Sequence, residues 1–240
     1  MHKDLPESAM RQNRSPSVRR LLAAAAIATF SLGAVAAGTF DDARNAAVMG
    51  DTKGLARLID GGIDPNSIDA NGNTLLILAA REGQAATVEA LLQRGVPIDQ
   101  QNPSGDSALM LAVLGGYDDV VRVLLKAGAK VNHPGWAPLH YVAFEGREGM
   151  LDALFAAGAD VNAKAPNLAT PLMLAARNGH IKVVRRLLAM PETDLNALNE
   201  AGLSADAWAL QNRNTDIAKL IEDERKRRGL PAPSMRITIE

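Results

Sequence analysis

Between residues 40 and 222 the chain alternates apolar blocks with polar stretches, and the blocks are of two kinds. The first kind is a continuous apolar run that ends in two small residues, as at residues 75–80, with Gly83 shortly after it. The second kind carries two adjacent leucines, as at Leu91 and Leu92. Short apolar runs bounded by glycine and polar residues predict a pair of short helices joined by a tight turn.

The same two blocks return at intervals of about 33 residues. Segments similar to residues 170–176 lie at residues 137–143, 107–113 and 74–80. A single helical pair cannot bury its own apolar face, so consecutive pairs have to stack and share one continuous core. The pattern therefore predicts a solenoid of helical pairs.

Each position that recurs has a physical task. A hydroxyl before the first helix can cap its N-terminus, and the residues in this position are Thr74, Ser107, Thr170 and Ser204. Pro138 and Pro171 fall in the first helical turn, where a backbone N–H is not needed. The small pair Ala175 and Ala176, with its counterparts, lets first helices of adjacent repeats approach closely.

This recurring set resembles the ankyrin repeat family. The matching features are the Thr-Pro-Leu-Met tetrapeptide at residues 170–173, the small pair, the glycine, the leucine pair and the Gly-Ala-x-Val-Asn tails at residues 128–132 and 158–162. The resemblance implies an all-α solenoid of five to six helix-turn-helix units with projecting β-turn or hairpin loops. We expect a monomer, with an ankyrin repeat domain at residues 37–222 and repeats at about 40–69, 70–102, 103–133, 134–164, 165–197 and 198–222.

The two outer repeats are degenerate. The first lacks the capping tetrapeptide and carries Asp41, Asp42 and Arg44 instead, as a solvent-facing end repeat requires. Beyond residue 222 charged residues replace apolar ones, and Pro231 and Pro233 follow. Residues 223–240 are therefore predicted to be a flexible basic tail.

The N-terminus has the pattern of a secretory signal peptide at residues 1–36. Five basic residues precede an uncharged, alanine-rich run at residues 21–38 that ends in small residues. We expect cleavage after Ala36, with Gly38 as the second choice and Met10 as an alternative start. A retained segment would instead anchor the chain in a membrane.

Composition excludes several classes of protein. The chain has no cysteine, so disulfides, thiol catalysis and cysteine–zinc sites are excluded. Its formal net charge of -1 argues against nucleic-acid binding. The sequence contains neither a nucleophile elbow nor a phosphate-binding loop, and no two histidines have metal-ligand spacing on one helix. We therefore expect no enzyme activity, no cofactor and no metal, because a hydrolase or metal-dependent enzyme needs a cluster of reactive residues.

His140 and His180 occupy the two positions of the repeat where the family often has a histidine that helps tie turns together, and we expect that structural role for both. The resemblance also implies that partners bind the concave face, formed by loop tips and first helices. The candidate patch there is Leu114, Trp136, Tyr141 and Phe144, with a polar rim of Arg81, Glu82, Glu145 and Arg177. Exposed aromatic residues in a groove are typical interface anchors. The alternative is that Trp136 covers the core where its turn is three residues short, and that Phe144 packs on its neighbour.

These observations predict a non-catalytic protein-binding module, periplasmic or secreted. By analogy with the family it would scaffold, protect or inhibit a partner protein, for example another exported enzyme. If residues 21–38 are retained, the alternative is a membrane-tethered adaptor.

Overall fold

The computed structural model describes residues 38–233, so the predicted signal peptide at residues 1–36 and the end of the predicted tail lie outside the described residues. The described part contains twelve α-helices and one short 3-10 helix, and its only β-bridges are isolated ones, Ile68–Thr74 and Gln101–Ser107. The first helices of the pairs are α2 (Phe40–Met49), α4 (Leu75–Arg81), α6 (Ala108–Gly115), α8 (Pro138–Glu145), α10 (Pro171–Arg177) and α12 (Ala205–Gln211). The second helices are α3 (Thr52–Asp60), α5 (Ala85–Leu92), α7 (Asp118–Lys126), α9 (Leu151–Ala156, preceded by η2, Glu148–Met150), α11 (Ile181–Leu188) and α13 (Thr215–Arg227).

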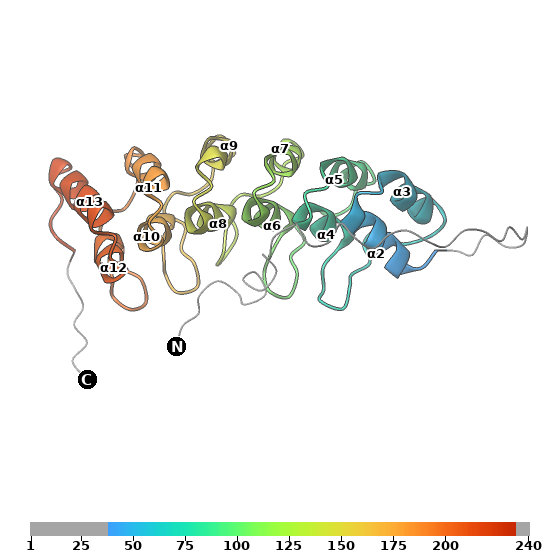
Figure 1. Ribbon diagram of the computed structural model, residues 1–240, viewed down its shortest axis with the longest axis horizontal. Helices are drawn as coiled ribbons and strands as arrows, with labels where there is room; N and C mark the ends of the chain where they lie inside the picture. Colours follow the sequence, from blue (N-terminus) through green and yellow to red (C-terminus); the bar gives the residue numbers. More distant parts are fainter. Residues whose placement is uncertain (1–37, 234–240) are drawn as a thin grey trace, which may run out of the picture.

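The six pairs stack side by side into an arched solenoid (Figure 1). The second helices form the outer row of the arch, and the first helices form the inner row, from which the long loops project. This arrangement confirms the predicted all-α fold, with six helical pairs. None of the helices within residues 38–233 is long and apolar enough to cross a membrane.

Most first helices begin as the sequence indicates. The Thr74 hydroxyl accepts a hydrogen bond from the Ile77 N–H at 3.1 Å, and Ser107 and Thr170 make the corresponding bonds. Ser204 differs, because its hydroxyl donates to Asp206 Oδ1 at 2.7 Å and does not cap α12. The first helix of the last repeat therefore lacks the hydroxyl cap that begins α4, α6 and α10.

The core runs without interruption along the array. The alanine pairs of α4 and α10 are fully buried, which allows consecutive first helices to pack closely. The second helices contribute Leu91, Leu124 and Leu187, each at most 1% exposed. Burial of this kind stabilises the array by about 25 cal/mol for each Å² of apolar surface removed from water.

The C-terminal end is longer than predicted. Helix α13 continues to Arg227, and Arg225 is only 4% exposed. The Arg225 guanidinium binds Asp206 through two hydrogen bonds of 2.7 and 2.9 Å, and Arg228 donates to the carbonyl of Leu188 at the end of α11. The prediction of a flexible basic tail from residue 223 is therefore wrong for residues 223–228, because Arg225 is held by α12 of its own repeat and Arg228 by the end of α11 in the preceding repeat.

Candidate functional site

The loop before α8 is the short one. It extends less far from the inner row than its neighbours do (Figure 1), and Trp136 lies near its end. The Trp136 ring is partly buried and meets the rings of His140 and Tyr141 edge-on, with centroid distances of 5.6 and 6.2 Å. Trp136 therefore packs against the core beside the short loop. This agrees with the second interpretation of the sequence, in which Trp136 covers the core there.

Tyr141 is fully buried, which contradicts its assignment to an exposed patch. Its hydroxyl donates a hydrogen bond of 2.5 Å to Oδ1 of Asp106, which lies in the loop of the preceding repeat and is 2% exposed. Removal from water raises the pKa of Asp106, although the hydrogen bonds from Tyr141 and Asn102 oppose the shift. Tyr141 can therefore donate a hydrogen bond to the buried Asp106 carboxylate, which the leucines at the same position of other repeats cannot do.

His140 has the structural role expected of it. Its Nδ1 accepts the Ala137 N–H at 2.9 Å, and its Nε2 lies 3.0 Å from the Ala163 carbonyl of the next loop. Burial lowers the pKa of His140 to about 4, so the ring is neutral at physiological pH. We refer to Trp136, His140, Tyr141 and Asp106 as the loop cluster.

Phe144 lies on the same helix but in different surroundings. It is partly buried at the end of α8, and the guanidinium carbon of Arg177, from α10, lies 5.9 Å from its ring centroid. The same carbon lies 5.0 Å from the ring centroid of Trp208, from α12. We refer to Phe144, Arg177 and Trp208 as the arginine cluster, which joins three consecutive repeats.

The backbone around the arginine cluster is fixed by the following repeats. Asn178 Nδ2 and His180 Nε2 both lie within hydrogen-bond distance of the Phe144 carbonyl, at 2.9 and 2.8 Å, which is the structural role expected of His180. Asn214 Nδ2 donates to the Arg177 carbonyl at 2.7 Å. Gly146 makes room for this arrangement, since a Cβ there would lie 2.5 Å from Nδ1 of His180.

The remaining predicted site residues are spread along the inner row. Arg81 and Glu82 form an ion pair of 3.2 Å with each other. Leu114 is partly buried against the core, and Glu145 lies 3.8 Å from Arg147. The structure therefore brings Phe144 and Arg177 together, places Trp136 with Tyr141, and leaves Arg81, Glu82 and Leu114 in earlier repeats.

Trp208 is a site residue that the sequence analysis missed. It occupies the repeat position of Tyr141, but in a degenerate repeat that lacks the usual tetrapeptide. The available signal was its spacing, because Trp208 follows the hydroxyl residue Ser204 at the distance that separates Leu78 from Thr74.

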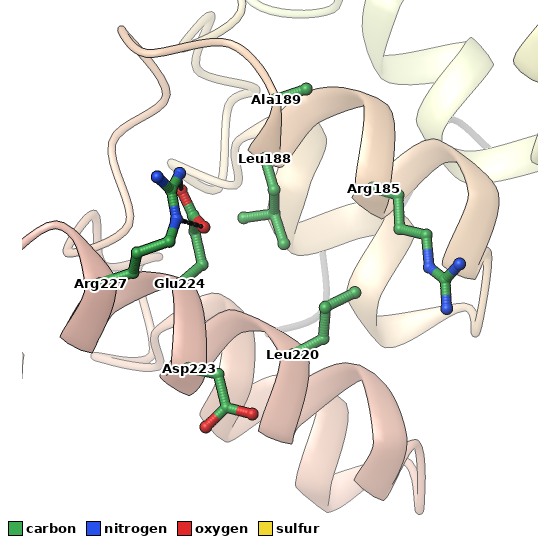
Figure 2. A pocket seen from close by; sticks show the side chains of 7 residues that line it. All are labelled: Arg185, Leu188, Ala189, Leu220, Asp223, Glu224 and Arg227. Carbon is green, nitrogen blue, oxygen red and sulfur yellow. Dashed lines mark hydrogen bonds and ion pairs between the residues drawn. The ribbon is translucent and has the colours of Figure 1, made fainter.

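Two further features of the described residues concern metal binding and pockets. In residues 38–233, His, Asp and Glu side chains nowhere gather in a group of three that could hold a metal ion. An open pocket of about 330 Å³ lies between α11 and α13 in the outer row. Figure 2 shows the side chains of Leu188 and Leu220 between the two helices and the ion pair of Glu224 with Arg227 at one end. This pocket contains no member of the arginine cluster.

Comparisons with known proteins agree with this architecture. A family model described as ankyrin repeats (3 copies) matches residues 44–135, 97–165 and 139–227. The crystal structure of the human ASB11 ankyrin repeat domain superposes with a TM-score of 0.68 at 25% identity, covering 76% of this chain and 82% of that one.

Similarity to curated proteins is confined to part of the array. Alpha-latrotoxin-Lg1a of Latrodectus geometricus is 34% identical over 85 residues, which is 34% of this chain and 6% of the toxin. Rabankyrin-5 of Mus musculus is 32% identical over 87 residues, which is 36% of this chain and 7% of that protein. The chain thus spans a small fraction of these relatives' length. Because the family model covers nearly all of the described residues, the chain belongs to the ankyrin repeat family.

Proposed function

We propose that this protein binds a partner protein through the inner face of its arch, with the arginine cluster as the central contact. The supporting observation is that two large aromatic rings flank one arginine across three repeats without being fully buried. Tryptophan and arginine are the residue types that most often dominate binding energy at protein interfaces. The rigid scaffold around them fits a partner that docks with little rearrangement.

The role that follows is that of an exported scaffold, protector or inhibitor of the partner, without catalysis of its own. Residues 1–36 support export by their sequence alone. N-terminal sequencing of the native protein tests this part of the proposal. A chain that begins at Ala37 supports export and cleavage, whereas a chain that retains residues 21–38 supports the membrane-tethered adaptor.

Partner binding is tested by affinity capture from the periplasmic extract of the source organism. The purified protein is compared with a Phe144→Ala/Trp208→Ala variant. Ile181→Ala is the matched control, because Ile181 is an exposed apolar residue on α11 in the outer row. One partner that both the wild-type protein and the control retain, and that the double variant loses, supports the proposal. Equal capture by all three proteins contradicts it.

A further inference from the structure

One loop of the inner row has a leucine where four other loops have a glycine. The position is the second residue before the N-cap of a first helix. A bulky residue with φ in the left-handed region is an outlier, because its side chain crowds the backbone there. The leucine is Leu168, with a φ of 60°, and the glycines have φ between 73° and 84°; they are Gly72, Gly105, Gly135 and Gly202.

The backbone of the loop imposes this conformation on Leu168. The Leu168 N–H donates to the Ala165 carbonyl at 2.8 Å, and the Ala165 N–H donates to the Ala169 carbonyl at 2.9 Å, which closes a turn of three residues. The last residue of such a turn adopts the left-handed conformation, for which glycine is the usual choice. The loops that contain Gly72 and Gly105 have the same pair of hydrogen bonds. The loop therefore keeps the geometry of its neighbours and holds a leucine in a strained position.

Burial of the side chain does not explain the leucine. Leu168 is 46% exposed, whereas Ala165 and Ala169, on either side of the turn, are at most 2% exposed. An apolar side chain stabilises the fold only by the surface that it removes from water. A glycine would relieve the backbone strain at this position. Strained residues that stability does not explain are concentrated at binding and active sites.

The surroundings of Leu168 are those of an interface residue. Leu168 lies in the loop between α9 and α10, which projects from the inner row (Figure 1). The exposed residues Lys164 and Glu200 lie on the same loop and on the next one, and the Glu200 N–H donates to the Asn167 carbonyl at 2.9 Å. An apolar anchor within a polar rim is typical of protein interfaces. Arg177 of the arginine cluster belongs to the same repeat, on α10.

We propose that Leu168 is a second anchor of the protein interface and inserts into an apolar pocket on the partner protein. A single side chain that projects from a loop tip is convex, so the surface that fits it is a concavity lined by apolar side chains. Hydrogen bonds to the next loop hold the tip in place, which lowers the entropic cost of binding. This inference rests on the proposed function and specifies a further binding residue and the shape of the partner surface.

The first part of the test measures stability and needs no partner. Leu168→Gly and Leu168→Asn remove the apolar side chain, and both new residues tolerate a positive φ. We expect the urea midpoint of unfolding to stay the same or to rise in both variants. Gly105→Leu is the converse control and should lower the midpoint through backbone strain, because a Cβ at Gly105 meets no atom within 4 Å. A midpoint that falls in both Leu168 variants would show that Leu168 serves folding and would overturn the inference.

The second part measures affinity for the partner that the wild-type protein captures, after that partner has been identified by mass spectrometry and purified. Isothermal titration calorimetry should show binding at least about tenfold weaker for Leu168→Gly and Leu168→Asn, a difference of about 1.4 kcal/mol. Leu168→Met keeps the apolar volume and should bind close to wild type. Ile68→Asn is the matched control and should also bind like wild type, because Ile68 is 53% exposed but lies on the loop before α4.

Other outcomes separate this inference from the proposed function. Leu168 variants that bind like wild type, while Phe144→Ala/Trp208→Ala loses the partner, would overturn the inference and leave the binding function. Equal weakening in Ile68→Asn would also overturn it, because the effect would not be specific to Leu168. A partner that the Leu168 variants lose and the double variant retains would support the inference and contradict the arginine cluster as the central contact. If the wild-type protein captured no partner, both proposals would be contradicted.

Discussion

Helix α8 contributes aromatic rings to two clusters with opposite surroundings. Tyr141 is fully buried in the loop cluster, where its hydroxyl binds the buried carboxylate of Asp106. Phe144, one turn later, is only partly buried and lies beside the guanidinium of Arg177. The first cluster ties one repeat to the loop of the preceding repeat, and the second leaves aromatic surface on the inner row. Two aromatic residues so close in sequence therefore serve stability in one case and, in our proposal, binding in the other.

The largest expected effect on stability is that of mutations in the loop cluster, whose tyrosine is fully buried. Tyr141→Ala should lower the free energy of unfolding by about 3–5 kcal/mol, because it leaves a cavity in the core. Tyr141→Phe should cost about 1–3 kcal/mol, since it removes only the donor to the buried Asp106 carboxylate. Urea denaturation followed by circular dichroism measures both values. If Tyr141→Ala cost no more than Tyr141→Phe, the ring would not be part of the core.

A leucine in the second-helix row gives the scale for an ordinary core residue. Leu187 is fully buried in α11, so Leu187→Ala should lower the free energy of unfolding by about 2–5 kcal/mol. The same urea experiment measures it. Unchanged stability would mean that the repeat register assigned to α11 is incorrect.

The buried carboxylate should give the loop cluster a distinctive pH dependence. The folded state raises the pKa of Asp106, so it binds a proton more readily than the unfolded chain does. The contribution of Asp106 to stability should therefore increase as the pH falls from neutral through the folded pKa, and it is complete below the unfolded value of about 3.8. Asp106→Asn, which resembles the protonated form, should remove this component.

Urea midpoints of the wild-type protein and Asp106→Asn, measured between neutral pH and about pH 4, test this expectation. The relevant quantity is the difference between the two proteins, because Glu224 contributes with the opposite sign at lower pH. Hydrogen bonds from Arg227 lower the pKa of Glu224 to about 2, so its stabilisation is lost as the pH falls from 4.5 towards that value. Parallel pH curves for the two proteins would contradict the role of Asp106.

The smallest expected effect on stability lies on the exposed side. Phe144→Ala and Trp208→Ala should each lower the free energy of unfolding by about 1–2 kcal/mol, because each removes a cation–π contact and the part of the ring surface that is buried against the core. Thermal melting measures this change. A loss as large as that of Leu187→Ala would assign these rings to packing and remove the distinction between the clusters.

The repeat pattern was sufficient to predict the fold, because glycines, hydroxyl residues and small pairs return at fixed positions with local physical causes. The site was harder. Tyr141 was assigned to the surface because the pattern does not reveal that Asp106, in another repeat, lies within reach of its hydroxyl. Arg225 was assigned to a solvated tail because its partner Asp206 lies in a different helix. In both cases the missing information was a contact between two elements, from Tyr141 to the loop of the preceding repeat and from Arg225 to the first helix of its own repeat, which spacing along the chain does not contain.

The two tryptophans of the chain allow the most direct test, since Trp136 lies in the loop cluster and Trp208 in the arginine cluster. Trp136→Phe and Trp208→Phe each leave a single fluorescent reporter. Both variants are titrated with the captured partner. Our account expects the emission of Trp208 to change with ligand and that of Trp136 to stay constant. A change confined to Trp136, or no change in Trp208 while the ligand binds, would contradict the assignment of binding to the arginine cluster.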